Sequence, residues 1–254
     1  MMTRRLQAGP IEALVRRADP HAVWAAGAAD SVHAGSPGDG DTSLDVGGLA
    51  AVLALWPVLG SLVAAGDLAL HTPLTAYGEG AAAGLPGAAT AHHLLTHGEG
   101  PPALAALTRL AEHLTGTPLA ECATARIWRP LGMDRTRFAD GTLYAPLADL
   151  VRFPRHLLST ADHPISRAWT AESLRIRTGE LTPSRGLLWH PAPAGVWAHH
   201  PPAATGPVLW VSPRHDRWAA LLPGAAPHSA PAPTPAPALR TAFREAVFSA
   251  TPLG

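Results

Sequence analysis

Few side chains in this sequence could act as a covalent nucleophile, and none sits beside an obvious base. Ser43 lies upstream of a long apolar segment without a base partner, whereas Ser61 falls inside that segment, where we expect it to be buried. A serine needs an adjacent base to become nucleophilic. The single cysteine, Cys122, has no neighbour that would lower its thiol pKa, so it is predicted to be a core thiol. Covalent catalysis through these side chains is therefore disfavoured.

Two histidines at helical spacing raise the question of a metal site. His93 and His97 are four residues apart, which places both on one face of a helix. A zinc-protease motif would need a glutamate directly after the first histidine, but Leu94 stands there and no third ligand is marked. One cysteine also excludes an internal disulfide framework and a cysteine metal cage. We therefore predict a structural role for this pair, with no metal and no cofactor.

The absence of lysine is the most informative feature of the composition. All 19 basic residues are arginine. Arginine stays protonated and cannot be the neutral general base of a serine–lysine dyad, so no such dyad exists anywhere in the chain. The formal net charge at neutral pH is +0. This balance gives no electrostatic reason to expect a nucleic acid or an anionic membrane as partner.

The uncharged segment 49–65 is the element around which the rest of the chain must be arranged. As a helix it would be apolar all round, so we predict that it is buried on every side. Pro57, Gly60 and Ser61 interrupt it and no basic residues flank it, which argues against a membrane span. The N-terminal residues carry a basic pair without a following apolar region, so no secretory signal is predicted. We expect a cytoplasmic protein.

Hydrophobic periodicity and turn residues predict the other elements. Helices are expected at residues 11–17, 103–115 and 238–250. Strands are expected at residues 20–27, 31–35, 186–189, 195–199, 208–213 and 218–222.

Several stretches of the chain match motifs of one protein family. The apolar segment ends in LVAAGDLALHTPL at residues 62–74, and residues 93–97 read HLLTH. Residues 114–119 read LTGTPL, residues 126–136 read RIWRPLGMDRT, and residues 147–153 read LADLVRF. In these motifs, and in their order along nearly the whole chain, the sequence resembles the class C-like branch of the serine β-lactamase, penicillin-binding-protein and esterase family.

The resemblance implies an α+β, β-lactamase/transpeptidase-like fold, with an antiparallel sheet flanked by helices. It implies a single domain over residues 1–254. A reduced helical lobe, approximately residues 41–160, would be inserted between the N-terminal strands and the C-terminal sheet and helix. The family's substrate-binding excursion after HLLTH is missing here, because His97 is followed closely by the helix predicted at 103–115.

The same resemblance locates the family's catalytic motifs, and each of them is degenerate. The serine and lysine positions of the S-x-x-K motif fall on Gly48 and Ala51, and the tyrosine motif should fall near Glu99, where no tyrosine stands. The histidine of the H-T-G motif corresponds to His200, which is followed by two prolines. Losing the nucleophile alone costs a serine hydrolase on the order of a million-fold in turnover. Acyl-serine hydrolysis is therefore not expected.

These observations favour a non-hydrolytic pseudoenzyme that binds a small molecule in the retained cleft. A second hypothesis is an enzyme of another type, such as a cyclase or isomerase of specialised metabolism acting on a biosynthetic intermediate. Trp189, Trp197, His199 and His200 could line its pocket, with histidine as acid or base. The alternative for these four residues is ordinary strand-face packing and surface imidazoles. A third hypothesis is a residual hydrolase that uses Ser43 or Ser61.

Overall fold

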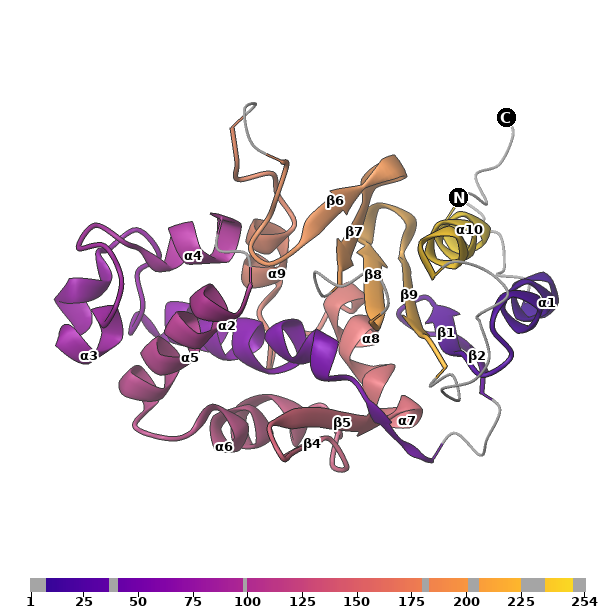
Figure 1. Cartoon of the computed structure of the whole chain (residues 1–254), viewed down its shortest axis with the longest axis horizontal. Helices are drawn as coiled ribbons and strands as arrows, with labels where there is room; N and C mark the ends of the chain where they lie inside the picture. Colours follow the sequence, from indigo (N-terminus) through magenta and orange to yellow (C-terminus); the bar gives the residue numbers. More distant parts are fainter. Residues whose placement is uncertain are drawn as a thin grey trace.

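A six-stranded antiparallel sheet forms one half of the molecule (Figure 1). Its strand order is β2-β1-β9-β8-β7-β6, so strands from the two ends of the chain pair with each other at its centre. The strands are β1 (Val23–Gly27), β2 (Val32–Gly35), β6 (His190–Ala192), β7 (Val196–His199), β8 (Val208–Ser212) and β9 (Arg217–Leu222). The computed structural model describes residues 8–36, 41–97, 100–179, 183–200, 206–224 and 236–248.

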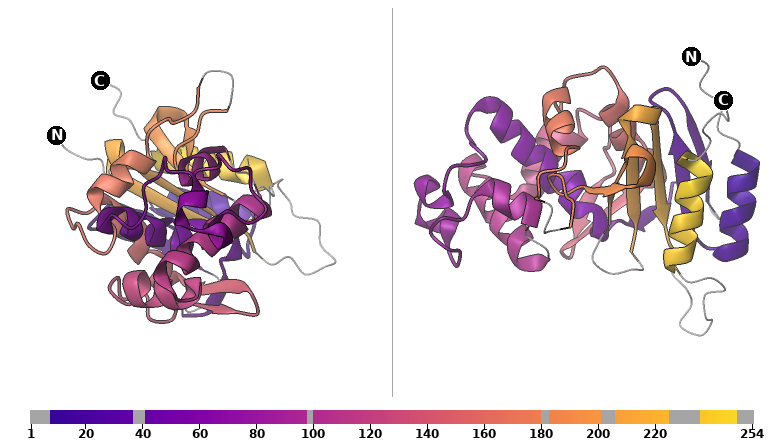
Figure 2. Two further views of the ribbon diagram at one scale, coloured as in Figure 1. Left: turned by 90° about the vertical axis from the view of Figure 1, so that its left-hand side faces the viewer. Right: turned by 90° about the horizontal axis from the view of Figure 1, so that it is seen from above.

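Helices α1 (Ala8–Ala18) and α10 (Ala236–Phe248) cover one face of this sheet (Figure 2). Phe243 of α10 contacts Trp24 and Trp210 of the sheet, with ring centroids 6.0 and 5.8 Å apart. Together with buried residues of α1, these rings form a core of their own. The opposite face of the sheet is therefore the one that meets the helical half of the chain.

A continuous helical run, residues 47–65, lies in the middle of the larger core. Its parts are a 3₁₀ turn (η1, Gly47–Leu49), a π-helical stretch (η2, Ala51–Leu55) and helix α2 (Trp56–Ala65). Gly66 ends the run with a φ of 81°, the left-handed conformation that glycine adopts readily at helix ends. Residues 52–60 are all buried, whereas the last turn reaches the surface. The predicted buried helix is confirmed for the centre of the segment.

Three indole groups anchor this helical run by hydrogen bonds. Trp128 donates its Nε1–H to the carbonyl of Leu53 at 2.7 Å. Trp169 donates to the carbonyl of Trp56 at 3.1 Å, and Trp56 in turn donates to the Ser173 hydroxyl at 2.9 Å. The ring centroids of Trp56 and Trp169 are 5.8 Å apart. These bonds satisfy buried polar groups in a core that is otherwise apolar.

The other helices surround the run, and a small second sheet lies beside its start (Figure 1). The helices are α3 (Glu79–Ala82), α4 (Ala91–His97), α5 (Pro101–Thr115), α6 (Leu119–Ala123), α7 (Leu147–Leu150), α8 (Arg152–Leu158) and α9 (Arg167–Ser173). The second sheet has the order β3-β5-β4 and consists of β3 (Ser43–Asp45), β4 (Arg137–Ala139) and β5 (Thr142–Pro146). Among the described residues, no helix combines the length and apolarity that a membrane crossing requires.

Most of the predicted elements are present, with ends shifted by a few residues. The strand predicted at 186–189 is wrong, because this segment is a turn closed by a 2.7 Å bond from the Gly186 N–H to the Trp189 carbonyl. Leu188 in this turn has a positive φ of 63°, and its N–H donates to the carbonyl of Leu95 rather than to a strand. The neighbouring strand, β6, begins only at His190.

Gly60 allows the close contact between α2 and Trp169, which gives a test of this packing. A Cβ at Gly60 would lie 2.4 Å from Cδ1 of Trp169. We expect Gly60→Ala to lower the free energy of unfolding by about 1–3 kcal/mol, the usual effect of overpacking a core. Urea denaturation measures this change.

Gly80→Ala is the matched control, because no atom lies within 4 Å of a Cβ built at this position in α3. It should be neutral or stabilising by up to about 1 kcal/mol. Equal stability of the two variants would contradict the described packing of Trp169.

Candidate functional site

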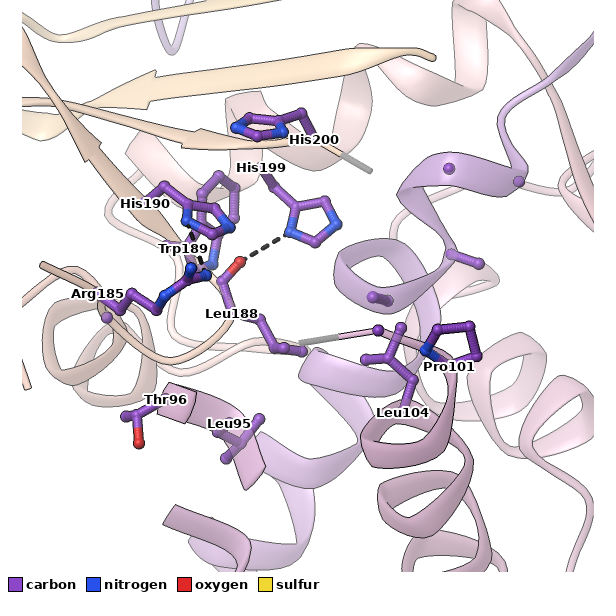
Figure 3. Close-up of a pocket in the computed structure, with 16 residues that line it drawn as sticks. Leu95, Thr96, Pro101, Leu104, Arg185, Leu188, Trp189, His190, His199 and His200 are labelled. Atoms are coloured by element: carbon purple, nitrogen blue, oxygen red, sulfur yellow. Dashed lines mark hydrogen bonds between the residues drawn. The ribbon is translucent and has the colours of Figure 1, made fainter. Parts of the chain in front are cut away.

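A cavity of about 560 Å³ lies between the start of the helical run and the β6–β7 edge of the large sheet (Figure 3). The helical run contributes backbone and small side chains, and the ends of α4 and α5 contribute Leu95, Thr96 and Leu104. The turn before β6 contributes Arg185 and Leu188. The cavity is thus assembled from five separate segments of the chain, with a mainly apolar lining and polar groups gathered near β6 and β7.

Gly48 and Ala51, the positions that the sequence resemblance assigns to the S-x-x-K motif, both lie in the wall of this cavity. The start of the helical run is fixed by Asp45, whose Oδ1 accepts a 2.8 Å bond from the Gly47 N–H. Neither Gly48 nor Ala51 carries a group that could attack a carbonyl or accept a proton. This part of the cavity wall therefore offers neither a nucleophile nor a base.

The structure brings most of the other predicted site residues to the same place. Trp189, His199 and His200 line the cavity. Trp197 does not, so its assignment as a pocket residue is wrong. It lies on the same face of β7 as His199, but about 7 Å farther along the strand at the usual rise per residue, and its ring packs against Gly186. The predicted tyrosine position, Glu99, lies outside the described residues.

His199 connects the two sides of the cavity. Its side chain is buried, and the Leu188 carbonyl lies 2.7 Å from its Nδ1. Because a carbonyl only accepts, Nδ1 carries the proton. Burial lowers the pKa of His199 to about 4, although hydrogen bonding to the backbone of Leu188 and Gly48 acts in the opposite direction. The imidazole is therefore neutral near pH 7 and holds the turn before β6 close to the helical run.

Arg185 and His190 form the polar edge of the cavity (Figure 3). Nη1 of Arg185 lies 3.2 Å from Nδ1 of His190. A guanidinium only donates, so Nδ1 accepts and the proton of the neutral imidazole is on Nε2. The ring of His190 also stacks on that of His200 at a centroid distance of 5.0 Å. Burial, and then the charge of Arg185, lower the pKa of His190 to about 4.

Thr96 brings a hydroxyl to the cavity wall, but that hydroxyl is already engaged. Its Oγ1 donates to the His92 carbonyl at 2.7 Å and lies 2.7 Å from Nδ1 of His97. Trp189 is fully buried, and in the described part of the chain its Nε1–H has no hydrogen-bond acceptor. The Trp189 ring packs against Trp56, with centroids 6.0 Å apart. These two residues shape the wall and offer no nucleophile.

The remaining candidate nucleophiles lie elsewhere. Ser43 is exposed on β3, and the Ser61 hydroxyl donates to the Val58 carbonyl at 2.8 Å and faces a different cavity. Cys122 is only 3% exposed, and burial raises the pKa of its thiol. None of the three lines the cavity at Gly48.

The predicted pair His93 and His97 is placed on one face of α4, where the two rings stack with centroids 5.0 Å apart. Within residues 8–36, 41–97, 100–179, 183–200, 206–224 and 236–248, no group of three histidine, cysteine or acidic side chains is arranged to hold a metal ion.

Arg185, His190 and Thr96 also line the cavity, and none of them was predicted from the sequence. Arg185 and His190 flank the turn at 186–189, which was wrongly predicted to be a strand. The alternation of inward and outward side chains along a strand does not predict that both residues face a cavity. The only available signal was the concentration of histidines at positions 190, 199 and 200 in one chain region.

No protein-family model matches this sequence, and no curated protein matches it. Several solved structures are similar in fold. A β-lactamase from Mycobacterium bovis has a TM-score of 0.66 at 19% identity, over 91% of this chain and 96% of that chain. A D-alanine carboxypeptidase from Burkholderia cenocepacia has a TM-score of 0.72 at 14% identity, over 96% and 100%. A β-lactamase from Sulfitobacter has a TM-score of 0.74 at 12% identity, over 96% and 98%.

This chain has the β-lactamase and penicillin-binding-protein fold. The α+β, β-lactamase/transpeptidase-like architecture predicted from the sequence motifs is therefore confirmed. In a β-lactamase-like fold, as in others, the chemistry depends on the side chains at the site and does not follow from the architecture. Here the described lining includes Gly48, Ala51, three imidazoles and one guanidinium.

The burial of His199 predicts a loss of stability in acid. Its pKa is about 4 in the folded protein, compared with 6.5 for an unperturbed histidine. As the pH falls, the unfolded chain therefore takes up this proton before the folded protein does. Neutral His199 therefore adds about 3 kcal/mol to the free energy of unfolding at neutral pH, relative to pH 4. This contribution is constant above about pH 6.5 and is lost as the pH falls toward 4. We expect His199→Asn to reduce the drop in unfolding free energy between about pH 7 and pH 4 by roughly this amount, measured by urea denaturation.

His113→Asn, which changes an exposed imidazole on α5, is the matched control and should keep the wild-type pH profile. For each protein, the change in unfolding free energy between about pH 7 and pH 4 is compared with that of the wild type. A general destabilisation of a variant affects both pH values and therefore cancels. An unchanged profile in His199→Asn would show that His199 is not held neutral in the folded state.

Proposed function

We propose that this protein binds a small molecule in the cavity at Gly48 and does not process it through an acyl-serine intermediate. The observation that carries the proposal is the lining itself. Gly48 and Ala51 stand in the cavity wall where the β-lactamase motifs would require serine and lysine. The cavity nevertheless remains open, with a volume of about 560 Å³. Small-molecule sites typically occupy roughly 300–1,000 Å³.

The character of the lining supports binding. Ala51, Leu104 and Leu188 give an apolar surface, and polar groups are confined to one edge. Ligand sites commonly combine a mostly apolar wall with a few fixed polar groups, which orient the bound molecule. His199 and Arg185 are held in place by hydrogen bonds, so the polar edge is preorganised.

A cyclase or isomerase that uses histidine as acid or base is the second candidate, because three imidazoles line the cavity. General acid–base catalysis is most effective when the pKa of the group lies near the working pH. The pKa values of His190 and His199 are both lowered to about 4, so at neutral pH each is a weak base and a very weak acid. For His190 and His199, this observation favours a role in binding over acid–base turnover.

A residual hydrolase is the least supported candidate. Ser43 is exposed and Ser61 faces another cavity, so neither hydroxyl reaches the wall formed by Gly48 and Ala51. Lysine is absent from the whole chain, and arginine cannot replace it as a base.

The proposal predicts that acylating reagents leave the protein unmodified. We expect no mass increase after incubation with a fluorophosphonate or with a penicillin, because none of the described residues brings an activated hydroxyl to the cavity. Intact-protein mass spectrometry measures this, with an active serine esterase treated in parallel to show that the reagents are competent.

Ser43→Ala and Ser61→Ala would locate any adduct that forms. Stoichiometric acylation of the wild type that disappears in one of these variants would overturn the proposal and restore the hydrolase hypothesis.

A further inference from the structure

We infer that His93 and His97, on α4, form a chelating site for a divalent late transition-metal ion such as Cu²⁺ or Zn²⁺. The two residues lie four apart on one face of the helix, and their rings stack with centroids 5.0 Å apart. Two histidines with this spacing supply metal ligands in helical zinc sites. Neither residue lines the cavity at Gly48, so the inference does not rest on the proposed function.

Neither imidazole belongs to the hydrophobic core. A structural role was expected from the sequence, because no glutamate follows His93 and no third ligand is marked. In the structure, however, the side chains of His93 and His97 are both exposed. Within the described part of the chain, the His93 ring makes no hydrogen bond, and its ring contact is with His97. Packing in the core therefore does not account for this pair.

The hydroxyl of Thr96 sets the tautomer of His97. Its Oγ1 lies 2.7 Å from the His92 carbonyl and 2.7 Å from Nδ1 of His97. Because a carbonyl only accepts, the hydroxyl proton goes to His92, and Nδ1 of His97 donates its own proton to Oγ1. Nε2 of neutral His97 therefore carries a lone pair. A hydrogen-bond acceptor on the second ring nitrogen is the usual arrangement of a metal-bound histidine.

The spacing of the two rings suits a single metal ion. Metal–nitrogen bonds of about 2.0–2.1 Å require the two ligand nitrogens to lie roughly 3 Å apart. The exposed ring of His93 can turn about its side-chain bonds to meet Nε2 of His97, whose ring is held by Thr96. Imidazole ligands suit Cu²⁺, Ni²⁺ and Zn²⁺, with Cu²⁺ bound most tightly, whereas Mg²⁺ prefers oxygen ligands.

Isothermal titration calorimetry with CuCl₂, ZnCl₂ and MgCl₂ tests the inference on the full, chelator-treated chain near neutral pH. We expect Cu²⁺ to bind more tightly than Zn²⁺, and Mg²⁺ not to bind measurably. Loss of the outer partner of a metal-bound histidine costs about 10- to 100-fold in affinity. His93→Gln and His97→Gln each remove a ligand itself, so each should weaken Cu²⁺ binding by roughly ten-fold or more. The electron paramagnetic resonance spectrum should show two nitrogen ligands on Cu²⁺ in the wild type and fewer in either variant.

Three further variants serve as controls. His113→Gln removes an exposed histidine of α5 that has no other histidine three or four residues away, and it should bind Cu²⁺ like the wild type. Thr96→Val removes the hydroxyl and should weaken Cu²⁺ binding about ten-fold. Thr96→Ser keeps the hydroxyl and should bind nearly as the wild type does. The two ligand variants change exposed side chains, so the test stands even if a Thr96 variant fails to fold.

Equal Cu²⁺ affinity in the wild type, His93→Gln and His97→Gln would overturn the inference, because binding would then be adventitious and spread over other histidines. A loss in His113→Gln as large as in the two ligand variants would overturn it in the same way. Unchanged affinity in a folded Thr96→Val variant would show that Thr96 is not the outer partner of His97.

Discussion

The need to cover an uncharged helical run on all sides determines much of this structure. Residues 52–60 lie in the core with no side chain that can reach water, so the surrounding helices and one face of the large sheet must pack against them. Indole N–H groups of Trp128 and Trp169 bond to carbonyls of the run, which fixes its position along its own axis. The bond from the Gly47 N–H to Asp45 fixes the start of the run, so the backbone at Gly48 is held at the wall of the cavity.

The same constraint makes the architecture largely independent of the side chains at Gly48 and Ala51. The packing of the run depends on Trp56, Trp169 and Gly60, all of which lie beyond the positions that face the cavity. Gly48 and Ala51 contribute little to that packing, so a change of side chain there alters the chemistry with little effect on the architecture. In the proposed function, this cavity binds a ligand without covalent chemistry at Gly48.

The sequence was sufficient for the fold and for part of the site. The uncharged segment predicted its own burial, and motif spacing located Gly48 and Ala51, both of which line the cavity. The turn at 186–189 was not predictable, because it is fixed by a long-range bond from the Leu188 N–H to Leu95 rather than by local pattern. Arg185 and His190 were missed for the same reason. The small sheet was also missed, since β3 and β4 have only three residues each, too few for alternation to be recognised.

The most direct test of the account is whether ligands bind at Gly48 and Ala51 rather than elsewhere. Ala51→Phe would place a ring in the cavity, whereas Ala105→Phe makes the same change at an exposed position of α5. Compounds from a metabolite library that raise the melting temperature of the wild type should be tested on both variants. The account predicts that these shifts persist in Ala105→Phe and are lost in Ala51→Phe. Shifts that are equal in the two variants would contradict it.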